Sequence, residues 1–316
     1  MKTLPPDGAR NAAPLAWTRR IRFRHLEVLL AIARHGSLTA AAAALDVTQP
    51  AVSQWLADIE SAIGAKLFLR GQRLTPTPFA APLIAHAQRV LNDAQRVVDD
   101  TAAIRAGGLG RVRIGAMPVA TVALVPAAVL RLHAEAPGLQ LSLVEDMAAG
   151  LWERFERNEL DVLVTRLDAH TLGAGLPQRR LFADRHRLVC GPRHPLLAHR
   201  RIGWPDVARY PWLMPVAGTP LRQAIEATFV AESVPLPTVL LASVSVTANQ
   251  VLLCETEALG VLSTTSATHA EKLGLLRALP LVLTQDIGDV GLVWRDPAPG
   301  PALARVLQAL GDEGAA

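Results

Sequence analysis

Residues 37–53 constrain this chain more than any other stretch, because they read as two short helices joined by a tight turn. Ser37 precedes an alanine-rich run and is placed to cap the helix that follows. The turn falls at residues 46–47. Thr48 then caps a second helix whose first turn contains Pro50, where a missing N–H costs nothing. This spacing predicts a helix-turn-helix, a motif that lays its second helix in the major groove of DNA.

Helical and strand patterns flank this motif on both sides. Apolar residues at three-to-four spacing predict a helix from Phe23 to Arg34, which His35-Gly36 ends. Leu67–Arg70 and Arg73-Leu74 predict the two short strands of a wing. A long helical pattern from about 77 to 105 has no partner within so small a domain, so we expect it to pair with a second copy of the chain. Packing on its own C-terminal half is the alternative.

The charge of the chain is unevenly divided. Residues 1–105 carry 13 Lys and Arg against 8 Asp and Glu, a net of +5, while residues 106–316 carry 19 against 20, a net of −1. The basic first third is where a phosphate backbone would bind, although chance clustering would also give so modest an excess.

Composition and hydropathy limit the class of protein. The 316 residues are half hydrophobic and 19% charged, which is typical of a globular chain of two or three domains. The longest apolar run, 118–130, is too short to cross a bilayer, and residues 1–20 lack the apolar core of a signal peptide. We therefore expect a cytoplasmic protein with a loose N-terminal extension and no membrane partner. Cys190 and Cys254 form no metal pattern, and Cys254 is expected to act as a small buried hydrophobe.

The second part of the chain alternates between strands and helices. Glycines at 106–110 predict a hinge. The βαβαβ rhythm over 111–165 predicts a parallel sheet, and later strands and helices predict a second α/β lobe with a cleft between the two. A helix at 301–310 is expected to return to the first lobe.

Motifs of the common enzyme classes do not occur in this part. It has no G-x-S-x-G elbow, P-loop, HExxH or strand-linked G-x-G-x-x-G. His194 before Pro195 reads as a turn element, and Asp161 after Glu159 reads as a solvated loop rather than a carboxylate pair. We therefore expect no enzyme, no catalytic residue and no metal site.

These features together resemble the LysR-type transcriptional regulators from Phe23 to Leu310. The N-terminal resemblance rests on an ordered set of motifs: Phe23-Arg24-His25-Leu26, Gly36-Ser37-Leu38-Thr39, Ala41-Ala42, Leu45 through Ser53, Ile59-Glu60, Ile63-Gly64, Leu67-Phe68, Arg70 and Leu74-Thr75-Pro76. Looser motifs follow at Arg113-Ile114-Gly115, Glu159-Leu160-Asp161-Val162, His194-Pro195-Leu196 and Ala258-Leu259-Gly260-Val261. The helix and wing motifs look nearest to the branch that regulates sugar-binding-protein genes.

The resemblance implies a fold, a domain layout and partners. The implied fold is an N-terminal winged helix-turn-helix, a long linker helix and a two-lobed α/β effector domain similar to type 2 periplasmic binding proteins. The expected layout is a flexible extension at 1–20, the winged domain at 21–78 with its helix-turn-helix at 38–57, the linker and dimerisation helix at 79–106, and the effector domain at 107–316, with lobe I at 111–184 and 285–316 and lobe II at 185–284. The implied partners are double-stranded promoter DNA, further copies of the chain up to a homotetramer, a small-molecule effector and RNA polymerase.

The family's DNA-binding residues carry over to this sequence one by one. They are Ser37, Thr39, Thr48, Gln49, Pro50, Ser53, Gln54, Arg70 and Arg73. Gln49 can pair bidentately with adenine. Ser37 and Thr39 would bind phosphate at the positive end of the second helix, and the two arginines would grip the backbone or minor groove from the wing.

The sequence also departs from the family pattern. Ala40 and Gln54 stand where the family often has Arg or Lys, Pro78 stands where a glycine is typical, and the wing is shorter than usual. Less positive charge predicts a shallower salt dependence of DNA binding than in a typical relative.

The effector is expected in the cleft, at helix N-termini that face the C-terminal ends of strands. Four segments should line it: 117–121, 165–168, 216–222 and 243–247. The candidate residues are Met117, Pro118, Thr121, Arg166, Asp168, Thr219, Arg222, Ser245 and Thr247. Capping hydroxyls suit a carboxylate or sugar hydroxyls, and either arginine could neutralise an acid. Caps also simply finish helices, which is the alternative for each of these hydroxyls.

A small-molecule co-inducer, a sugar or an organic acid, is thus the one ligand expected, and no cofactor. Two alternative functions remain at this point. One is a regulator that senses redox state through its cysteines, and the other is a DNA-binding protein that needs no effector.

Overall fold

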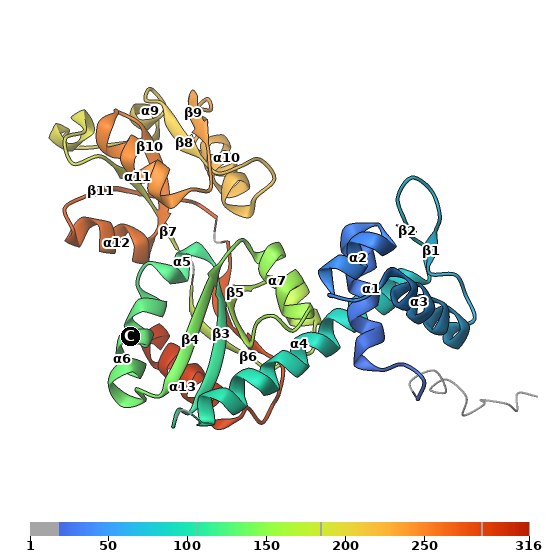
Figure 1. Ribbon diagram of the computed structural model, residues 1–316. Helices are drawn as coiled ribbons and strands as arrows, with labels where there is room; N and C mark the ends of the chain where they lie inside the picture. Colours follow the sequence, from blue (N-terminus) through green and yellow to red (C-terminus); the bar gives the residue numbers. More distant parts are fainter. Residues whose placement is uncertain (1–18, 106, 184, 286, 316) are drawn as a thin grey trace, which may run out of the picture. The chain divides into compact units, whose positions relative to one another are not determined.

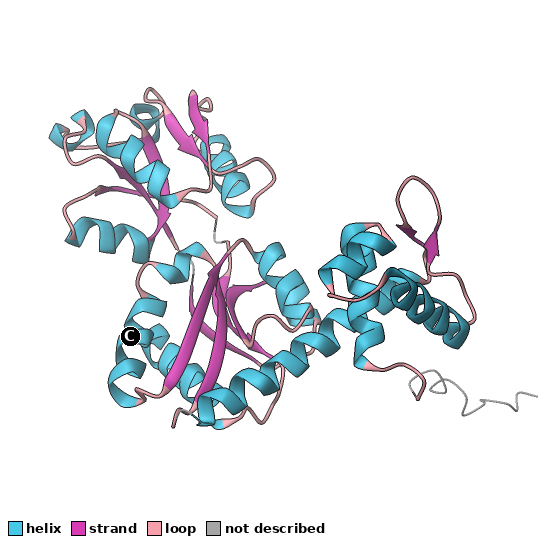
Figure 2. Cartoon of the chain, viewed as in Figure 1, coloured by secondary structure: helices cyan, strands magenta, loops and turns pink. Residues whose placement is uncertain are grey.

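The computed structural model describes residues 19–105, 107–183, 185–285 and 287–315. The chain forms two compact units, drawn in Figures 1 and 2. Unit 1 runs to Asp99 and includes Glu156–Asn158, and unit 2 comprises Asp100–Phe155 and the chain from Glu159 onward. Most of the expected N-terminal extension, residues 1–18, lies outside the described residues, as does residue 106 of the expected hinge. None of the helices in the described part of the chain has the length and apolarity to cross a bilayer.

Unit 1 is a small helical domain with a two-stranded wing. Its elements are α1 (Phe23–His35), α2 (Leu38–Ala44), α3 (Gln49–Ile63), β1 (Phe68–Leu69), β2 (Thr75–Pro76) and the first part of α4 (Ala80–Arg105). The expected long helix begins three residues later than Thr77, because Thr77 belongs to the wing. Its backbone N–H donates to the Leu67 carbonyl at 2.8 Å and its hydroxyl to the Lys66 carbonyl at 2.8 Å.

The core of unit 1 explains the alanine run of α2. Ala41 and Ala42 are buried, and their small side chains let α2 pack closely against its neighbours. The buried residues around them are Leu26, Val28, Leu29, Ile32, Val52, Ile59, Leu67, Phe68, Ala80 and Ala87. Gly36 ends α1 in the left-handed region, with φ of 64°, and this conformation favours glycine.

Unit 2 contains two five-stranded sheets, one in each lobe. Lobe I is built from β3 (Gly110–Ala116), α5 (Pro118–Thr121), α6 (Leu124–Glu135), β4 (Leu139–Glu145), α7 (Ala148–Glu156), β5 (Val162–Leu167), α8 (Ala169–Gly173), β6 (Gln178–Ala183), β12 (Asp289–Trp294) and α13 (Pro301–Ala315). Lobe II is built from β7 (His186–Cys190), η1 (Pro195–Ala198), α9 (Trp204–Val207), β8 (Trp212–Met214), α10 (Pro220–Ala231), β9 (Val239–Ala242), α11 (Val246–Glu255), β10 (Leu259–Ser263), α12 (Thr264–Lys272) and β11 (Arg277–Val282).

Both sheets are mixed rather than parallel. In lobe I the strand order is β4-β3-β5-β12-β6, in which β3, β4 and β5 are parallel as the βαβαβ rhythm predicts. The last strand, β12, runs antiparallel to β5 and β6, because the chain comes back to lobe I from lobe II. In lobe II the order is β11-β7-β10-β8-β9, and β7 runs antiparallel to both of its neighbours. The expectation of parallel strands over 111–165 therefore holds, and β8, β9 and β10 of lobe II are parallel as well.

The helix expected near 120–134 is divided into α5 and α6. Pro126 explains the division, because a proline is tolerated in the first turn of a helix but not in its interior. The C-terminal helix returns to lobe I as expected. In Figure 1, α13 lies beside α6, and Arg131 of α6 pairs with Asp312 of α13 at 2.8 Å.

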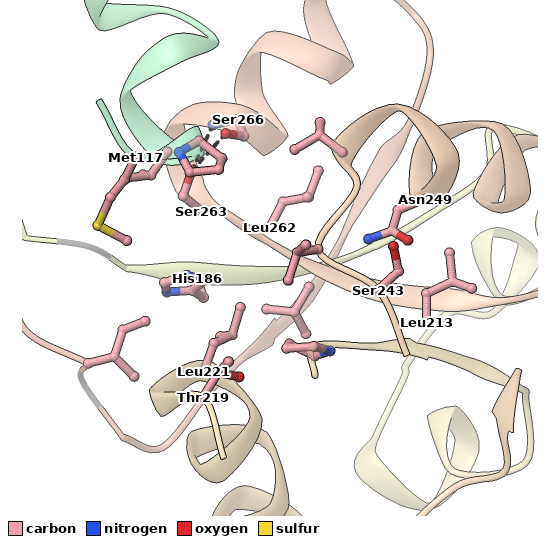
Figure 3. Close-up of a pocket in the computed structure, with 18 of the residues that line it drawn as sticks. Met117, His186, Leu213, Thr219, Leu221, Ser243, Asn249, Leu262, Ser263 and Ser266 are labelled. Carbon is pink, nitrogen blue, oxygen red and sulfur yellow. Dashed lines mark hydrogen bonds between the residues drawn. The ribbon is translucent and has the colours of Figure 1, made fainter. Parts of the chain in front are cut away.

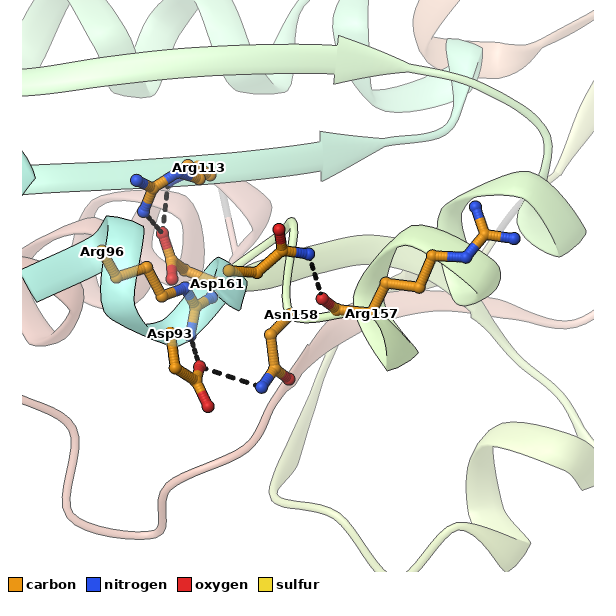
Figure 4. Close-up of polar contacts among 7 residues, drawn as sticks. Asp93, Arg96, Arg113, Arg157, Asn158 and Asp161 are labelled. Carbon is orange, nitrogen blue, oxygen red and sulfur yellow. Dashed lines mark hydrogen bonds and ion pairs between the residues drawn. The ribbon is translucent and has the colours of Figure 1, made fainter. Parts of the chain in front are cut away.

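Asp161 has a structural role that the sequence reading missed. Its carboxylate accepts a hydrogen bond from the backbone N–H of Arg113 at 2.7 Å and lies 3.7 Å from the Arg113 guanidinium (Figure 4). Both side chains are 15% exposed, so Asp161 anchors the start of β5 to β3 and is not part of a solvated loop. Within unit 1, Asn92 of α4 donates to the Arg157 carbonyl at 2.5 Å. Asn158 donates to Asp93 at 2.9 Å, and Figure 4 marks this bond.

Candidate functional site

The N-terminal half of α3 is anchored on one face and open on the other. Val52 is fully buried in the core of unit 1. Gln49, Pro50 and Gln54 are exposed, and Ser53 is half-buried. The residues expected to read DNA therefore share the accessible face of a fixed helix. The Gln54 amide already donates to Asp58 at 2.9 Å, so Asp58 orients it along the helix.

The two expected caps of this motif differ in the structure. Ser37 caps α2, and its hydroxyl accepts from the backbone N–H of Ala40 at 3.4 Å. Thr48 occupies the N-cap position of α3, but its side chain makes no capping hydrogen bond, which corrects the sequence reading. The helix forms without this capping bond, because Pro50 lies in the first turn of α3 and its fixed φ already suits a helix. Thr39 and Thr48 are both exposed.

The wing carries Arg70 and Arg73, both of them exposed. Its strands lie slightly later than expected, at 68–69 and 75–76, with Phe68 opposite Pro76. The wing is joined to the end of α1, where the backbone N–H of Leu74 donates to the Gly36 carbonyl at 2.8 Å. A Cβ on Gly36 would lie 3.4 Å from Arg73 Nε, so this glycine also leaves room for the arginine.

Glu60 attaches the wing to α3, a role that sequence reasoning missed. Its side chain is buried, with one carboxylate oxygen accepting from the backbone N–H of Leu67 at 2.9 Å and the other 2.5 Å from the Lys66 ammonium. The sequence signal that could have revealed this role was an acidic residue next to Ile59 on the apolar side of the helix. A buried carboxylate at such a position needs partners, and the wing supplies them.

Unit 2 has a cavity of about 180 Å³ between its two sheets, called here the interlobe cavity (Figure 3). Lobe I contributes Met117, Pro118, Val119, Met147, Arg166 and Ile287. Lobe II contributes the rest of the lining, which includes His186, Leu213, Pro215, Thr219, Leu221, Ser243, Asn249, Leu262, Ser263 and Ser266. Many of these residues follow the C-terminal ends of parallel strands, where ligands bind in open α/β folds.

Four expected effector residues line this cavity: Met117, Pro118, Arg166 and Thr219. Thr219 caps α10, and its hydroxyl accepts from the Arg222 N–H at 3.4 Å while donating to the Val216 carbonyl at 2.8 Å.

The other five candidates do not line the cavity: Thr121, Asp168, Arg222, Ser245 and Thr247. Most of them are engaged locally. Asp168 caps α8 through the Thr171 N–H at 3.0 Å, and Arg222 pairs with Glu226 at 2.5 Å. Thr121 bonds to the Glu145 carboxylate, and Ser245 caps α11. Thr247, one residue into α11, is exposed.

Sequence reasoning missed the polar residues His186, Asn249, Ser263 and Ser266 of the cavity. Ser263 caps α12 by accepting from the Ser266 N–H at 3.1 Å, and the two hydroxyls are 2.9 Å apart. A serine followed three residues later by a second serine was a weak signal for this cap. Within the described residues, no cluster of three or more His, Cys, Asp or Glu side chains could hold a metal ion.

Neither cysteine has the surroundings of a redox sensor. Cys190 is fully buried, and burial raises the pKa of its thiol to about 12. Because the thiolate is the reactive form, such a thiol is inert near neutral pH. Cys254 is half-buried rather than buried as expected, and its thiol donates to the Leu275 carbonyl at 3.2 Å.

Comparison with known proteins decides the family. The model of the bacterial regulatory helix-turn-helix protein of the lysR family matches residues 23–81, and the LysR substrate binding domain matches residues 105–315. The chain belongs to the LysR family. This LysR-family member is therefore a DNA-binding transcriptional regulator with an effector-binding domain.

Curated relatives of the LysR-family chain are regulators over nearly its whole length. The HTH-type transcriptional regulator GbpR of Azospirillum brasilense is 28% identical over 297 residues, covering 92% of this chain and 86% of GbpR. The HTH-type transcriptional regulator PcaQ of Agrobacterium fabrum is 29% identical over 294 residues, covering 92% of this chain and 94% of PcaQ. Among solved structures, the LysR family transcriptional regulator CbnR has a TM-score of 0.67 at 19% identity, covering 93% of this chain and 99% of that one. The last comparison confirms the fold.

Proposed function

We propose that this regulator responds to a small organic anion bound in the interlobe cavity, and that binding alters its complex with promoter DNA. One observation carries the choice of an anion. The helices α10, α11 and α12 all begin at this cavity, and none of the described residues that line it is Asp or Glu. Helix N-termini favour negative charge, and Arg166 adds a full positive charge from lobe I.

The remaining walls favour an acid with an apolar body. Met117, Met147, Leu213, Leu221 and Leu262 all line the cavity. A sugar placed against such side chains would bury hydroxyls without partners, which costs free energy for each unpaired group. A sugar effector, suggested by the resemblance to the branch that regulates sugar-binding-protein genes, is therefore the second candidate.

The DNA contacts of this proposal lie on α3 and the wing. Gln49 would contact base edges, and Arg70 and Arg73 would contact phosphates. Dimerisation would use α4, where Val97, Val98 and Ile104 are 60–66% exposed. A dimer of this kind binds a two-fold repeat, and pairs of dimers would give the tetramer. A protein that acts on promoter DNA in this way works in the cytoplasm, together with RNA polymerase.

A thermal-shift screen of the full-length protein tests the anion proposal. Aliphatic and aromatic carboxylates are compared with their uncharged methyl esters and with neutral sugars. We expect one or more carboxylates to raise the melting temperature, their esters to have no effect, and Arg166→Gln to weaken the response. Stabilisation by a sugar with no response to any acid would overturn the proposal in favour of the second candidate.

A further inference from the structure

Asn249 lines the interlobe cavity and has a buried polar atom without a hydrogen-bond partner among the described residues. It lies in α11, and its Oδ1 is buried without a hydrogen-bond donor. Buried polar atoms in native proteins are nearly always paired, because an unpaired one retains the full penalty of desolvation. Ser263, by contrast, is paired with Ser266. An orphaned acceptor in the wall of a ligand cavity indicates that the ligand supplies the donor.

The surroundings of Asn249 strengthen this indication. A second cavity of about 290 Å³ adjoins the interlobe cavity, between α11 and α12. Residues that line both cavities are Val246, Asn249, Leu253, Leu262 and Ser266. Figure 3 shows Asn249 on α11 beside Ser243 and facing the space in front of Leu262. Three of the five shared residues are aliphatic, so a hydrogen bond to Asn249 would form in a poorly solvated place, where it is strong.

We propose that Asn249 determines effector specificity by accepting a hydrogen bond from a hydroxyl or N–H group of the bound acid. This inference rests on the proposed function. Arg166 belongs to lobe I and Asn249 to lobe II, so an acid held between the lobes presents different atoms to the two residues. The effector class is accordingly a hydroxy or amino acid derivative with an apolar body. An acid without the donor would bury Asn249 Oδ1 unpaired, and a site built for a hydrogen bond rejects such an analogue strongly.

Matched acids with and without one hydroxyl test the inference on the full-length protein. The probes are benzoate with 4-hydroxybenzoate, and hexanoate with 6-hydroxyhexanoate, with dissociation constants measured by calorimetry. We expect the hydroxy acid of at least one pair to bind roughly tenfold more tightly or better. In Asn249→Leu the two members of that pair should bind equally. Gln250→Leu is the matched control, because this neighbouring amide lines the second cavity alone, and it should keep the preference.

The melting temperature of the unliganded variant separates a ligand contact from a structural role. Removing an unpaired buried acceptor should leave Asn249→Leu at least as stable as the wild type. A clear loss of stability would mean that the amide supports the fold, and would overturn the inference. Asn249→Ala gives the same comparison if leucine does not fit.

The binding outcomes distinguish this inference from the proposed function. If no acid binds, the anion proposal fails and this inference fails with it. If acids bind but the hydroxyl brings no preference, or the preference survives in Asn249→Leu, this inference alone is overturned.

Discussion

Replacing Glu60 by alanine should loosen the wing of the DNA-binding domain without changing any residue that is expected to contact DNA. The Glu60 carboxylate is buried and holds the backbone N–H of Leu67 at the start of the wing. Beyond Leu67 the wing carries Arg70 and Arg73, the two cations expected on the DNA backbone. Their positions therefore depend in part on this buried contact between α3 and the wing, alongside the hydrogen bond from Leu74 to Gly36.

The magnitude follows from the two contacts of Glu60. The hydrogen bond from Leu67 is charge-assisted and buried, and its loss, which leaves the N–H unpaired, costs about 1.5–3 kcal/mol. The ion pair with Lys66 adds less than about 1 kcal/mol, because the lysine side chain is 78% exposed. We expect Glu60→Ala to lower the free energy of unfolding of unit 1 by about 1.5–4 kcal/mol in total.

Urea denaturation and mobility shift together check this prediction. Glu60→Ala should unfold at lower urea and bind operator DNA more weakly, with a smaller salt dependence as the wing arginines lose their phosphates. Two control variants bracket the effect. Lys66→Ala should behave nearly as the wild type, and Glu60→Gln, which keeps an acceptor for Leu67, should fall between. Equal losses in Glu60→Ala and Lys66→Ala would refute the reasoning.

Three further predictions concern unit 2 and α4. Burial lowers the pKa of His194 below 6.5, so the neutral ring stabilises the fold above about pH 6.5, and this contribution is lost as the pH falls through the lowered pKa. Melting curves at decreasing pH should therefore show a smaller loss of stability in His194→Gln than in the wild type. Peroxide should leave DNA binding unchanged in wild type and Cys190→Ala alike, because the thiol stays protonated, and a peroxide response that Cys190→Ala abolishes would contradict this. Replacing both Val97 and Val98 by glutamate should yield monomers in sedimentation, whereas an intact dimer would place the interface elsewhere.

The helices of the DNA-binding domain could be predicted from the sequence because single residues mark where they begin and end. Ser37, Gly36 and Pro50 mark helix ends by their own chemistry, and the structure places α1, α2 and α3 accordingly. The strand β6 could not be read in this way. Its segment begins Gln-Arg-Arg and becomes a strand by pairing with β12, where Phe182 lies opposite Val290.

In the candidate site, too, the residues marked by a local sequence signal could be predicted and the others could not. Thr219 was found because a threonine before a proline is a strong local cap signal, and the structure places that cap at the cavity. Asp168 was misplaced because its carboxylate caps its own helix α8 by accepting from the Thr171 N–H, instead of lining the cavity. Ser263 and Asn249 were missed because their roles depend on how helices from distant parts of lobe II meet around one cavity.

A small organic anion in the interlobe cavity is proposed to control the complex with DNA. A nuclease footprint on the mapped operator, with and without an acid that stabilises the protein, distinguishes this control from an effect elsewhere when wild type is compared with Val244→Trp. Val244 lines the cavity and is 53% exposed, so a tryptophan there should fill the cavity and spare the fold. We predict that the acid changes the wild-type footprint and leaves that of Val244→Trp unchanged, although both proteins protect the same operator without acid. A footprint that responds equally in both proteins would contradict the account.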